Sequence, residues 1–251
     1  MRRFSRHILQ LLFGASILHL LWIGGYYALH SAVLPAPWEV YRHMFTMDWG
    51  QLIIHTSASL ERIGWGVAIA LILAWGISLT AVLSPRIGRV FSTFIYFSYP
   101  IPKLALLPVV MLLGGLGEVT KVIMIVLIIL FQLAVSMRDA LMTIPAEHFM
   151  LTRSLGANTL GLLHQVLLPA VLPASLSALR VAIGTAISVL FVTETYGTTL
   201  GLGYYITDAW MRIDYLDMYA GIALLSLVGV ALFILVDLAE VVLCPWLHRK
   251  K

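Results

Sequence analysis

Residues 119–136 read VTKVIMIVLIILFQLAVS, and residues 142–168 read MTIPAEHFMLTRSLGANTLGLLHQVLL. The first stretch is almost long enough to cross the apolar core of a bilayer as a helix, which takes about 20 mostly apolar residues. The second stretch is longer and more polar than most connections between packed helices. These features predict a membrane helix that is followed by a structured segment outside the apolar core.

The composition of the whole chain agrees with a protein that crosses a membrane several times. Of its 251 residues, 61% are hydrophobic and 11% are charged, and the mean hydropathy is +0.96. Soluble domains carry about 25% charged residues. The composition therefore excludes a water-soluble enzyme, a disordered chain and a disulfide-stapled secreted module, and the single cysteine permits no internal disulfide.

Apolar runs of sufficient length predict an all-α membrane protein with about six transmembrane helices in a single domain, residues 1–251. The predicted spans are residues 7–29, 60–83, 90–113, 119–136, 169–193 and 218–243. The basic start of the first span also has the form of a signal peptide, but its apolar part is too long for one, and we expect it to be retained. Two stretches between spans are more polar: residues 35–57 form a polar, aromatic stretch, and residues 196–215 are predicted as a loop.

The distribution of basic residues predicts the orientation in the membrane. With both termini in the cytoplasm, that side collects Arg2, Arg3, Arg6, Arg86, Arg89, Arg138, Arg153, Arg249, Lys250 and Lys251. This asymmetry agrees with the positive-inside rule. It also accounts for the formal net charge of +4 through membrane topology, so we expect contact with lipid and no nucleic-acid partner.

The segment 142–168 is punctuated like two short helices. Pro145 suits the first turn of a helix, where its missing N–H has no partner to lose. Gly156 suits the position after a helix end, where the backbone is left-handed. Asn158 can cap a second helix that runs from Thr159 to Leu168.

The same segment presents apolar side chains at Phe149, Leu151 and Leu155. Two interpretations remain open from these features. The pair of helices could be gripped by another protein, or it could lie flat on the lipid headgroups. Pro169 and Pro173 mark the return of the chain to the bilayer.

Ionisable residues inside apolar spans are candidates for the path of a solute, since each costs about 2.5–3.5 kcal/mol at the bilayer centre on insertion scales. Lys103 follows Pro100 and Pro102, where a broken helix is expected. It would either face an anionic solute or extend its amine to water at the membrane boundary. Thr193 and Glu194 end the fifth span, and Glu194 would line a gate, pair with a base or stay near water.

Other polar and small residues predict contacts between helices. Arg180 is expected to pair with Asp237 or Glu240, and His19 to make a hydrogen bond between helices. The glycines of the second span are expected at close helix contacts: Gly64, Gly66 and Gly76. The aromatic residues of 35–57 would form either a docking surface or an interfacial belt.

Several motifs resemble one family. The sequences IPAE at 144–147, TRSLGA at 152–157 and VLLPA at 166–170 resemble the loop with Glu-Ala-Ala, glycine and Leu-Pro elements in permease subunits of bacterial ATP-binding cassette (ABC) importers. The run YPIPKLALLP at 99–108 and Glu194 followed by GLGY at 201–204 are similar to the nitrate/sulfonate/taurine branch of that family. The likeness covers nearly the whole chain in the same order.

The resemblance implies a type I ABC importer permease fold with a cytoplasmic coupling-helix loop. The residues that it assigns to coupling with an ATPase are Glu147, Thr152, Arg153, Ser154, Leu155, Gly156, Ala157 and Pro169. The Glu-Ala-Ala triplet of the family is Met150-Leu151-Thr152 here. Because residues three and four apart share a helix face, Glu147 is expected to make the polar contact instead.

The resemblance also implies partners and a location. The chain has no G-x-x-x-x-G-K-[ST] motif, so ATP and magnesium are expected on separate ATP-binding cassette subunits, with no cofactor, metal or catalytic residue here. A second permease copy, as a homodimer, or a homologue would complete the assembly. A periplasmic or lipid-anchored binding protein would deliver a small solute, an anion such as nitrate, a sulfonate or taurine. The expected location is the bacterial inner membrane.

Two other functions are weighed against this interpretation. A membrane-embedded enzyme would need a nucleophile and base or paired carboxylates, and the sequence has no H-E-x-x-H or G-x-S-x-G motif. An ion-coupled secondary transporter would tend to show internal repeats and paired acids in mid-membrane, and neither is visible.

Overall fold

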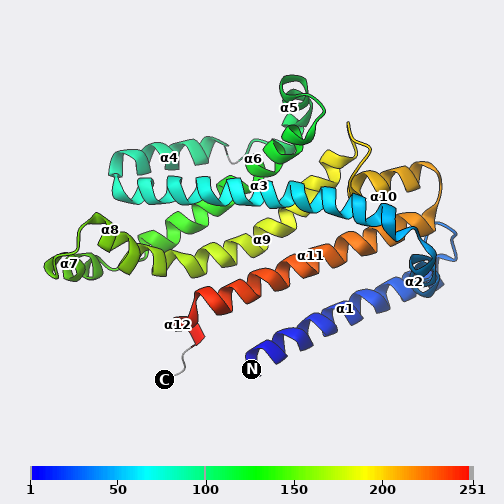
Figure 1. Cartoon of the computed structure of the whole chain (residues 1–251), viewed down its shortest axis with the longest axis horizontal. Helices are drawn as coiled ribbons and strands as arrows, with labels where there is room; N and C mark the ends of the chain where they lie inside the picture. The colour runs from blue at the N-terminus through cyan, green and yellow to red at the C-terminus, as the bar shows by residue number, and fades with distance from the viewer. Residues whose placement is uncertain (1, 99, 249–251) are drawn as a thin grey trace.

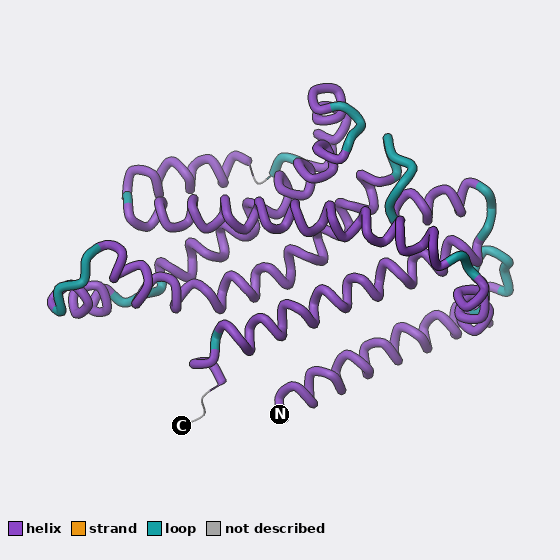
Figure 2. Tube along the Cα trace, in the orientation of Figure 1, coloured by secondary structure: helices purple, strands orange, loops and turns teal. Residues whose placement is uncertain are grey.

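The computed structural model describes the backbone of residues 2–98 and 100–248 and the side chains of residues 13–98 and 100–247. Helices and the turns between them make up this part of the chain, and no residue in it lies in a β-strand. The long helices lie side by side in an elongated bundle, with short helices at its two ends (Figures 1 and 2).

The five long helices are α1 (Arg2–Leu29), α3 (Trp49–Leu83), α6 (Glu118–Met142), α9 (Leu168–Glu194) and α11 (Tyr215–Leu243). The short elements are α2 (Pro37–Thr46), α4 (Pro85–Ser98), η1 (Lys103–Leu106), α5 (Leu107–Gly114), α7 (Ala146–Ser154), α8 (Thr159–Leu162), η2 (Leu163–Leu167), α10 (Leu202–Met211) and α12 (Pro245–His248). Of the two η elements, η1 is a 3-10 turn and η2 is a π-helical turn.

Four helical runs in the described residues are long and apolar enough to cross a membrane: Trp49–Leu83, Glu118–Met142, Thr159–Glu194 and Tyr215–Leu243. A fifth crossing results if α4 and the η1–α5 pair, which are bent by 83°, count as one broken span. The described part of the first predicted span is a shorter apolar helix, Phe13–Leu29. The count of six spans stays a prediction.

Each of the two polar stretches contains a helix, which corrects the loop predicted over residues 196–215. Helix α2 lies within 35–57 and α10 lies within 196–215. Helix α3 also begins earlier than the predicted span, because Asp48 caps it and accepts hydrogen bonds from Gly50 N at 2.9 Å and Gln51 N at 3.3 Å. Caps of this kind extend a membrane helix into polar sequence, where hydropathy gives no signal.

Two further boundaries differ from the prediction. Helix α6 continues past Arg138 and Asp139 to Met142, because these side chains pair with each other at the surface and leave the helix intact. The third span is two helices on either side of Pro100 and Pro102, as expected of prolines that remove backbone donors. The tight turn predicted after α5 is present, and Gly115 adopts a φ of +77° there.

The two ends of the bundle carry different elements (Figure 1). Helices α7 and α8 extend beyond the end at which α3 turns into α4, while α2 and α10 cover the opposite end. Helix α6 runs from the α10 end to α7, and α9 returns from α8, so these two helices connect the ends.

Two predicted polar contacts are confirmed. Arg180 donates from Nε to Asp237 and from a terminal nitrogen to Glu240, each at 2.8 Å, which joins α9 to α11. His19 Nδ1 and Tyr41 Oη lie 3.1 Å apart and link α1 to α2.

The core lies where α6 packs against α3 on one side and α9 on the other. In the second half of α3 the buried positions are small and recur about every four residues, namely Gly66, Ala70, Ala74, Ser78 and Ala81. At Gly66 an added Cβ would lie 2.5 Å from Ile125 Cγ2, so glycine is required for the observed approach. The predicted close packing of Gly64 and Gly76 is wrong, since a Cβ at either would meet nothing within 4 Å.

Replacing Gly66 with leucine should separate α3 from α6. We expect Gly66→Leu to lower the thermal unfolding temperature of the full chain in mild detergent, because overpacking a core typically costs about 1–3 kcal/mol. The matched control is Gly64→Leu, which adds the same side chain where there is space. Equal melting temperatures for the two variants would contradict this account of the α3–α6 contact.

Candidate functional site

The coupling segment, residues 142–168, folds as two short helices joined by a tight turn. Helix α7 ends at Ser154, and Gly156 adopts the left-handed φ of +83° that lets Ala157 N donate to Thr152 O at 3.2 Å. Asn158 then caps α8 by accepting a hydrogen bond from Gly161 N at 2.9 Å. The predicted roles of Gly156 and Asn158 in the local fold are therefore confirmed.

The coupling segment projects from the bundle with little of its surface covered. No residue of α7 is buried. Four large apolar side chains are 62–79% exposed: Met150, Leu151, Leu155 and Leu160. Phe149 instead packs against the core and fixes α7 to the bundle. An exposed apolar surface on a well-ordered element is typical of a surface that binds a partner.

The predicted coupling residues lie together on this segment. Glu147, Arg153, Ser154, Leu155 and Gly156 are exposed, while Thr152 and Ala157 are half-buried. The hydroxyls of Thr152 and Ser154 donate to backbone carbonyls one turn earlier in α7, at 2.7 and 2.6 Å, so both hydroxyls are bonded within their own helix.

The helix predicted to end at Leu168 does not end there, because the chain continues past Pro169 to Glu194 as one helical run of 36 residues that begins at Thr159. The π-helical turn η2 lies within this run, directly before Pro169. A π turn accommodates a proline that would otherwise conflict with the preceding carbonyls, so the helix continues through Pro169. The coupling segment is thus continuous with a membrane helix.

Lys103 lies at the break in the third span, beside a cavity of about 400 Å³. Its Nζ donates to Ser98 O at 3.1 Å and lies 5.0 Å from the centre of the Phe131 ring. The remaining lining is apolar apart from Gln132: Ile101, Pro102, Leu104, Ile128 and Val189. A cation held by a carbonyl and an aromatic face can meet a small anion here.

At the other end of α9, Glu194 is completely buried and pairs with Arg62 of α3, which is 2% exposed. Arg62 donates to Glu194 Oε1 at 2.5 Å and to Leu200 O at 2.8 Å. Ser59 donates to both carboxylate oxygens, at 2.9 and 3.0 Å. Of the alternatives predicted for Glu194, pairing with a base is therefore confirmed, and a position near water is wrong.

The glycines that follow Glu194 are explained by this carboxylate. Gly203 N donates to Glu194 Oε2 at 2.8 Å. Gly201 has a φ of +121°, and a Cβ there would overlap the carboxylate. A Cβ on Gly203 would lie 2.8 Å from Glu194 Cβ. The Glu194 and GLGY motif is thus one packed unit that closes over a buried charge.

Thr193 is also buried, and its hydroxyl donates to Leu190 O at 3.0 Å within its own helix. A role of Thr193 and Glu194 in the path of a solute stays a prediction. Arg62 and Ser59 were not singled out from the sequence. The signal was present, because an arginine near the start of an apolar span needs a buried acid, and Glu194 ends another span.

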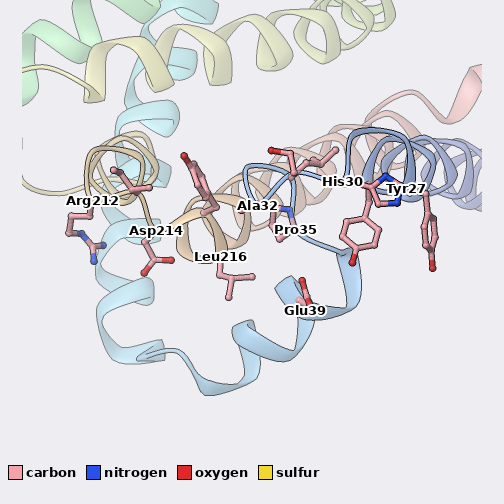
Figure 3. A pocket seen from close by; sticks show the side chains of 13 residues that line it. Tyr27, His30, Ala32, Pro35, Glu39, Arg212, Asp214 and Leu216 are labelled. Carbon is pink, nitrogen blue, oxygen red and sulfur yellow. The ribbon is translucent and has the colours of Figure 1, made fainter.

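A second cavity, of about 870 Å³, lies between the α1–α2 loop and the α10–α11 turn (Figure 3). Charged and aromatic side chains line it, among them Tyr27, His30, Glu39 and Arg212. His30 and Ile213, both in its lining, have positive φ values of 46° and 61°. Such a conformation is a clear outlier for a β-branched residue and concentrates strain at this surface.

Beside this cavity, the end of the bundle is held by a polar junction. His43 Nε2 and Asp217 Oδ1 are 2.7 Å apart, which links α2 to α11. Burial, followed by the nearby Asp217 carboxylate, raises the pKa of the Tyr205 phenol on α10. Tyr205 therefore remains a hydrogen-bond donor at neutral pH. Among the side chains that the structure describes, no group of three His, Cys, Asp or Glu residues could hold a metal ion.

The chain matches the family model described as "Binding-protein-dependent transport system inner membrane component" over residues 43–249. It is 29% identical to the formylaminopyrimidine transport permease protein of Halalkalibacterium halodurans, with 87% of each chain covered. It is also 29% identical to the taurine transport system permease protein of Escherichia coli, with 85% of this chain and 80% of the relative covered.

Solved structures with a similar fold include a bacterial alginate ABC transporter in complex with a pentasaccharide-bound periplasmic protein. It has a TM-score of 0.67 at 13% identity, with 96% of this chain and 93% of that chain covered. A methionine ABC transporter in an inward-facing conformation has a TM-score of 0.57 at 21% identity, with 76% and 94% covered. At these identities the likeness supports the fold.

Removing the Ser59 hydroxyl should weaken the buried cluster around Glu194. Ser59 Oγ donates to the carboxylate and accepts from Leu202 N at 2.8 Å, so Ser59→Ala leaves a buried N–H without its partner. Such a loss costs about 1–3 kcal/mol. We expect a lower unfolding temperature in detergent than for Ser57→Ala, an exposed serine on the same helix. A Ser59→Ala variant as stable as Ser57→Ala would refute the importance of this contact.

Proposed function

The chain belongs to the family of binding-protein-dependent transport system inner membrane components and is therefore a membrane-spanning transport permease, and we propose that a separate ATPase subunit drives it. In this proposal ATP and magnesium bind to the ATP-binding cassette partner, which grips the coupling segment. The permease itself carries no catalytic residue. It provides the path for the solute and the element on which the partner acts.

The observation that carries the proposal is the exposed apolar surface of the coupling segment. Its leucines alternate with charged residues such as Glu147 and Arg153, which are also exposed. A mixed surface of this kind suits the cleft of a protein, which can meet both types of group. Binding flat on lipid would bring fewer of the charged groups into favourable contact.

The continuity of the coupling segment with α9 supports a mechanical role. A displacement of α8 is applied directly to a membrane helix whose other end carries the buried Glu194. The 27 residues of α9 correspond to roughly 40 Å of helix. The proposed mechanism is a rigid-body shift that alternates the path between an inward-open and an outward-open arrangement.

The cavity beside Lys103 supports a small anionic solute such as nitrate, a sulfonate or taurine. Its volume of about 400 Å³ suits a small molecule, and Lys103 is the charged group of its lining. The relatives named above are transport permeases for formylaminopyrimidine and for taurine. The charge of Lys103 favours the anionic class.

A second copy of the permease, as a homodimer, or a homologue would complete the pathway. Residues 100–102 connect α4 to η1 and are exposed, although they interrupt a span. Irregular backbone at membrane depth is tolerated where protein or a water-filled cavity covers it. Coverage of this break by a neighbouring permease meets that requirement.

The end opposite the coupling segment is the proposed docking surface for an external, periplasmic or lipid-anchored binding protein. It carries the cavity of Figure 3, whose charged and tyrosine side chains suit a protein partner. The start of α4, at the same end as the coupling segment, carries Arg86 and Arg89. By the positive-inside rule we propose that the coupling segment and both termini face the cytoplasm of a bacterial cell.

A bulky residue at Gly156 should uncouple transport from ATP hydrolysis. A β-branched side chain at a φ of +83° costs about 1–2 kcal/mol, which corresponds to about a 5–30-fold change in a conformational equilibrium. We expect Gly156→Val to insert normally but to show uptake reduced to that extent in cells. The control is Gly76→Val, where a Cβ meets nothing within 4 Å. Normal uptake by Gly156→Val would count against the proposed coupling role.

Removing the charge of Lys103 should impair uptake of a solute that carries a sulfonate group. In membranes that contain the complete transporter, we expect Lys103→Met to lose most uptake of radiolabelled taurine, while Lys103→Arg retains it because the positive charge remains. The amount of assembled complex serves as the control. Equal taurine uptake by the methionine and arginine variants would exclude Lys103 from the selection of the solute.

A further inference from the structure

Arg62 is shared between two carboxylates whose surroundings differ sharply. Glu194 is completely buried, whereas the side chain of Glu118, which begins α6, is 64% exposed. Arg62 donates to Glu118 from Nε and, at 2.6 Å, from a terminal nitrogen. Exposed ion pairs exchange readily with water, and buried ones do not. We call the Arg62–Glu194 bonds the buried arm and the Arg62–Glu118 bonds the exposed arm. The exposed arm is therefore the weaker of the two.

The buried arm is built to stay intact. Glu194 accepts hydrogen bonds from Arg62, Ser59 and Gly203, so its breakage would leave several buried groups without partners. These contacts join α3, α9 and the start of α10 into one body at this end of the bundle. We refer to Ser59, Arg62, Glu194 and Gly203 as the anchor.

The exposed arm connects the anchor, through Glu118 and the glycine turn, to α5, which packs against fewer elements than the anchored helices do. Glu118 follows the glycine turn 114–117, which links α6 to α5. Among the described elements α5 contacts chiefly α6 and η1, and its Leu112 and Leu113 are 86% and 85% exposed. Sparse packing of this kind permits local movement that the anchored helices do not share.

The glycine turn also closes against the loop that the anchor holds. A Cβ on Gly197 would lie 2.8 Å from Leu116 Cβ, so the turn and the α9–α10 loop are in direct contact. Lys121 holds the turn on its own side by donating to Leu116 O at 3.0 Å and Gly117 O at 3.3 Å. Arg62 is bonded to the α9–α10 loop through Leu200 O, and Glu118 directly follows the glycine turn. The Arg62–Glu118 ion pair is therefore the charged bond between the loop and the turn.

We propose that Arg62 is a positioning residue of a gate at the end opposite the coupling segment, with Glu194 as its permanent anchor and Glu118 as its releasable arm. When the Glu118 arm opens, the glycine turn and α5 move away from the α9–α10 loop. Arg62 keeps its bonds to Glu194 and to Leu200 O in both arrangements. This inference rests on the proposed function for the meaning of the gate, but its opening is measurable without solute or ATP.

The test reads the accessibility of one buried position in the full chain, in native membranes. Thr120 is 2% exposed and donates to Gly115 O at 2.6 Å, so Thr120→Cys in a Cys244→Ser background reports whether the turn is closed. A membrane-impermeant maleimide is added from the side opposite the coupling segment. Glu118→Gln should raise the labelling rate about two- to fivefold, the factor expected for loss of an ion pair whose carboxylate is exposed to water.

Matched variants separate the two arms. Glu61→Gln removes a neighbouring exposed carboxylate and should label like the parent, and Glu118→Asp, which keeps the charge, should fall between the parent and Glu118→Gln. Glu194→Gln should instead lower the yield of folded protein in mild detergent, which Glu118→Gln should preserve. Labelling of Glu118→Gln no faster than that of Glu61→Gln would overturn the proposal, as would equal losses of folded protein from the two glutamine variants.

The outcome is independent of the coupling segment. Should Gly156→Val transport normally while Glu118→Gln labels faster, the proposed ATPase coupling fails and the gate stands. Should the labelling remain unchanged while Gly156→Val loses uptake, the gate fails and the proposed function stands.

Discussion

The close approach of α3 to α6 is the contact on which the rest of the structure depends. Within a bilayer, lipid tails are as apolar as leucine, so helices associate through tight packing and buried polar bonds. The small residues of α3 provide both, since Gly66 admits Ile125 and Ser78 donates to Ala134 O at 2.9 Å. With α6 fixed in this way, its first turn meets Arg62 and its last turn delivers the chain to the coupling segment.

The sequence predicted local structure correctly where a residue type strongly favours one backbone conformation or one capping role. Gly156 and Asn158 predicted a turn and a cap, and both are present. It failed where tertiary contacts decide: hydropathy could not locate α2 and α10, which are amphipathic helices in polar stretches, nor tell Gly66, which packs, from Gly64, which does not. The Glu194 motif was visible, but its partner lies 132 residues away and required the fold.

The anchor and the coupling segment are opposite in character although one helix joins them. At the anchor, charges and hydroxyls are buried and have their partners, so the four anchor residues are held in one arrangement. At the coupling segment, apolar groups are exposed and the charged groups face outward. A chain that acts alone would be more stable if it buried the exposed leucines of the coupling segment against its own helices. Their exposure is therefore typical of a surface that a partner covers.

The irregular backbone of the connecting helix lies near the coupling segment. Pro169 and Pro173 are one turn apart and so weaken the same face of α9, because each removes a backbone donor, and the π turn η2 precedes them. Beyond Pro173 the helix packs against α6 and α11 and has the Arg180 pair to hold it. A displacement of the coupling segment would therefore bend α9 near its start and move the remainder as a rigid rod. The rod ends at Glu194, so the anchor is where such a movement would be passed to α3 and α10.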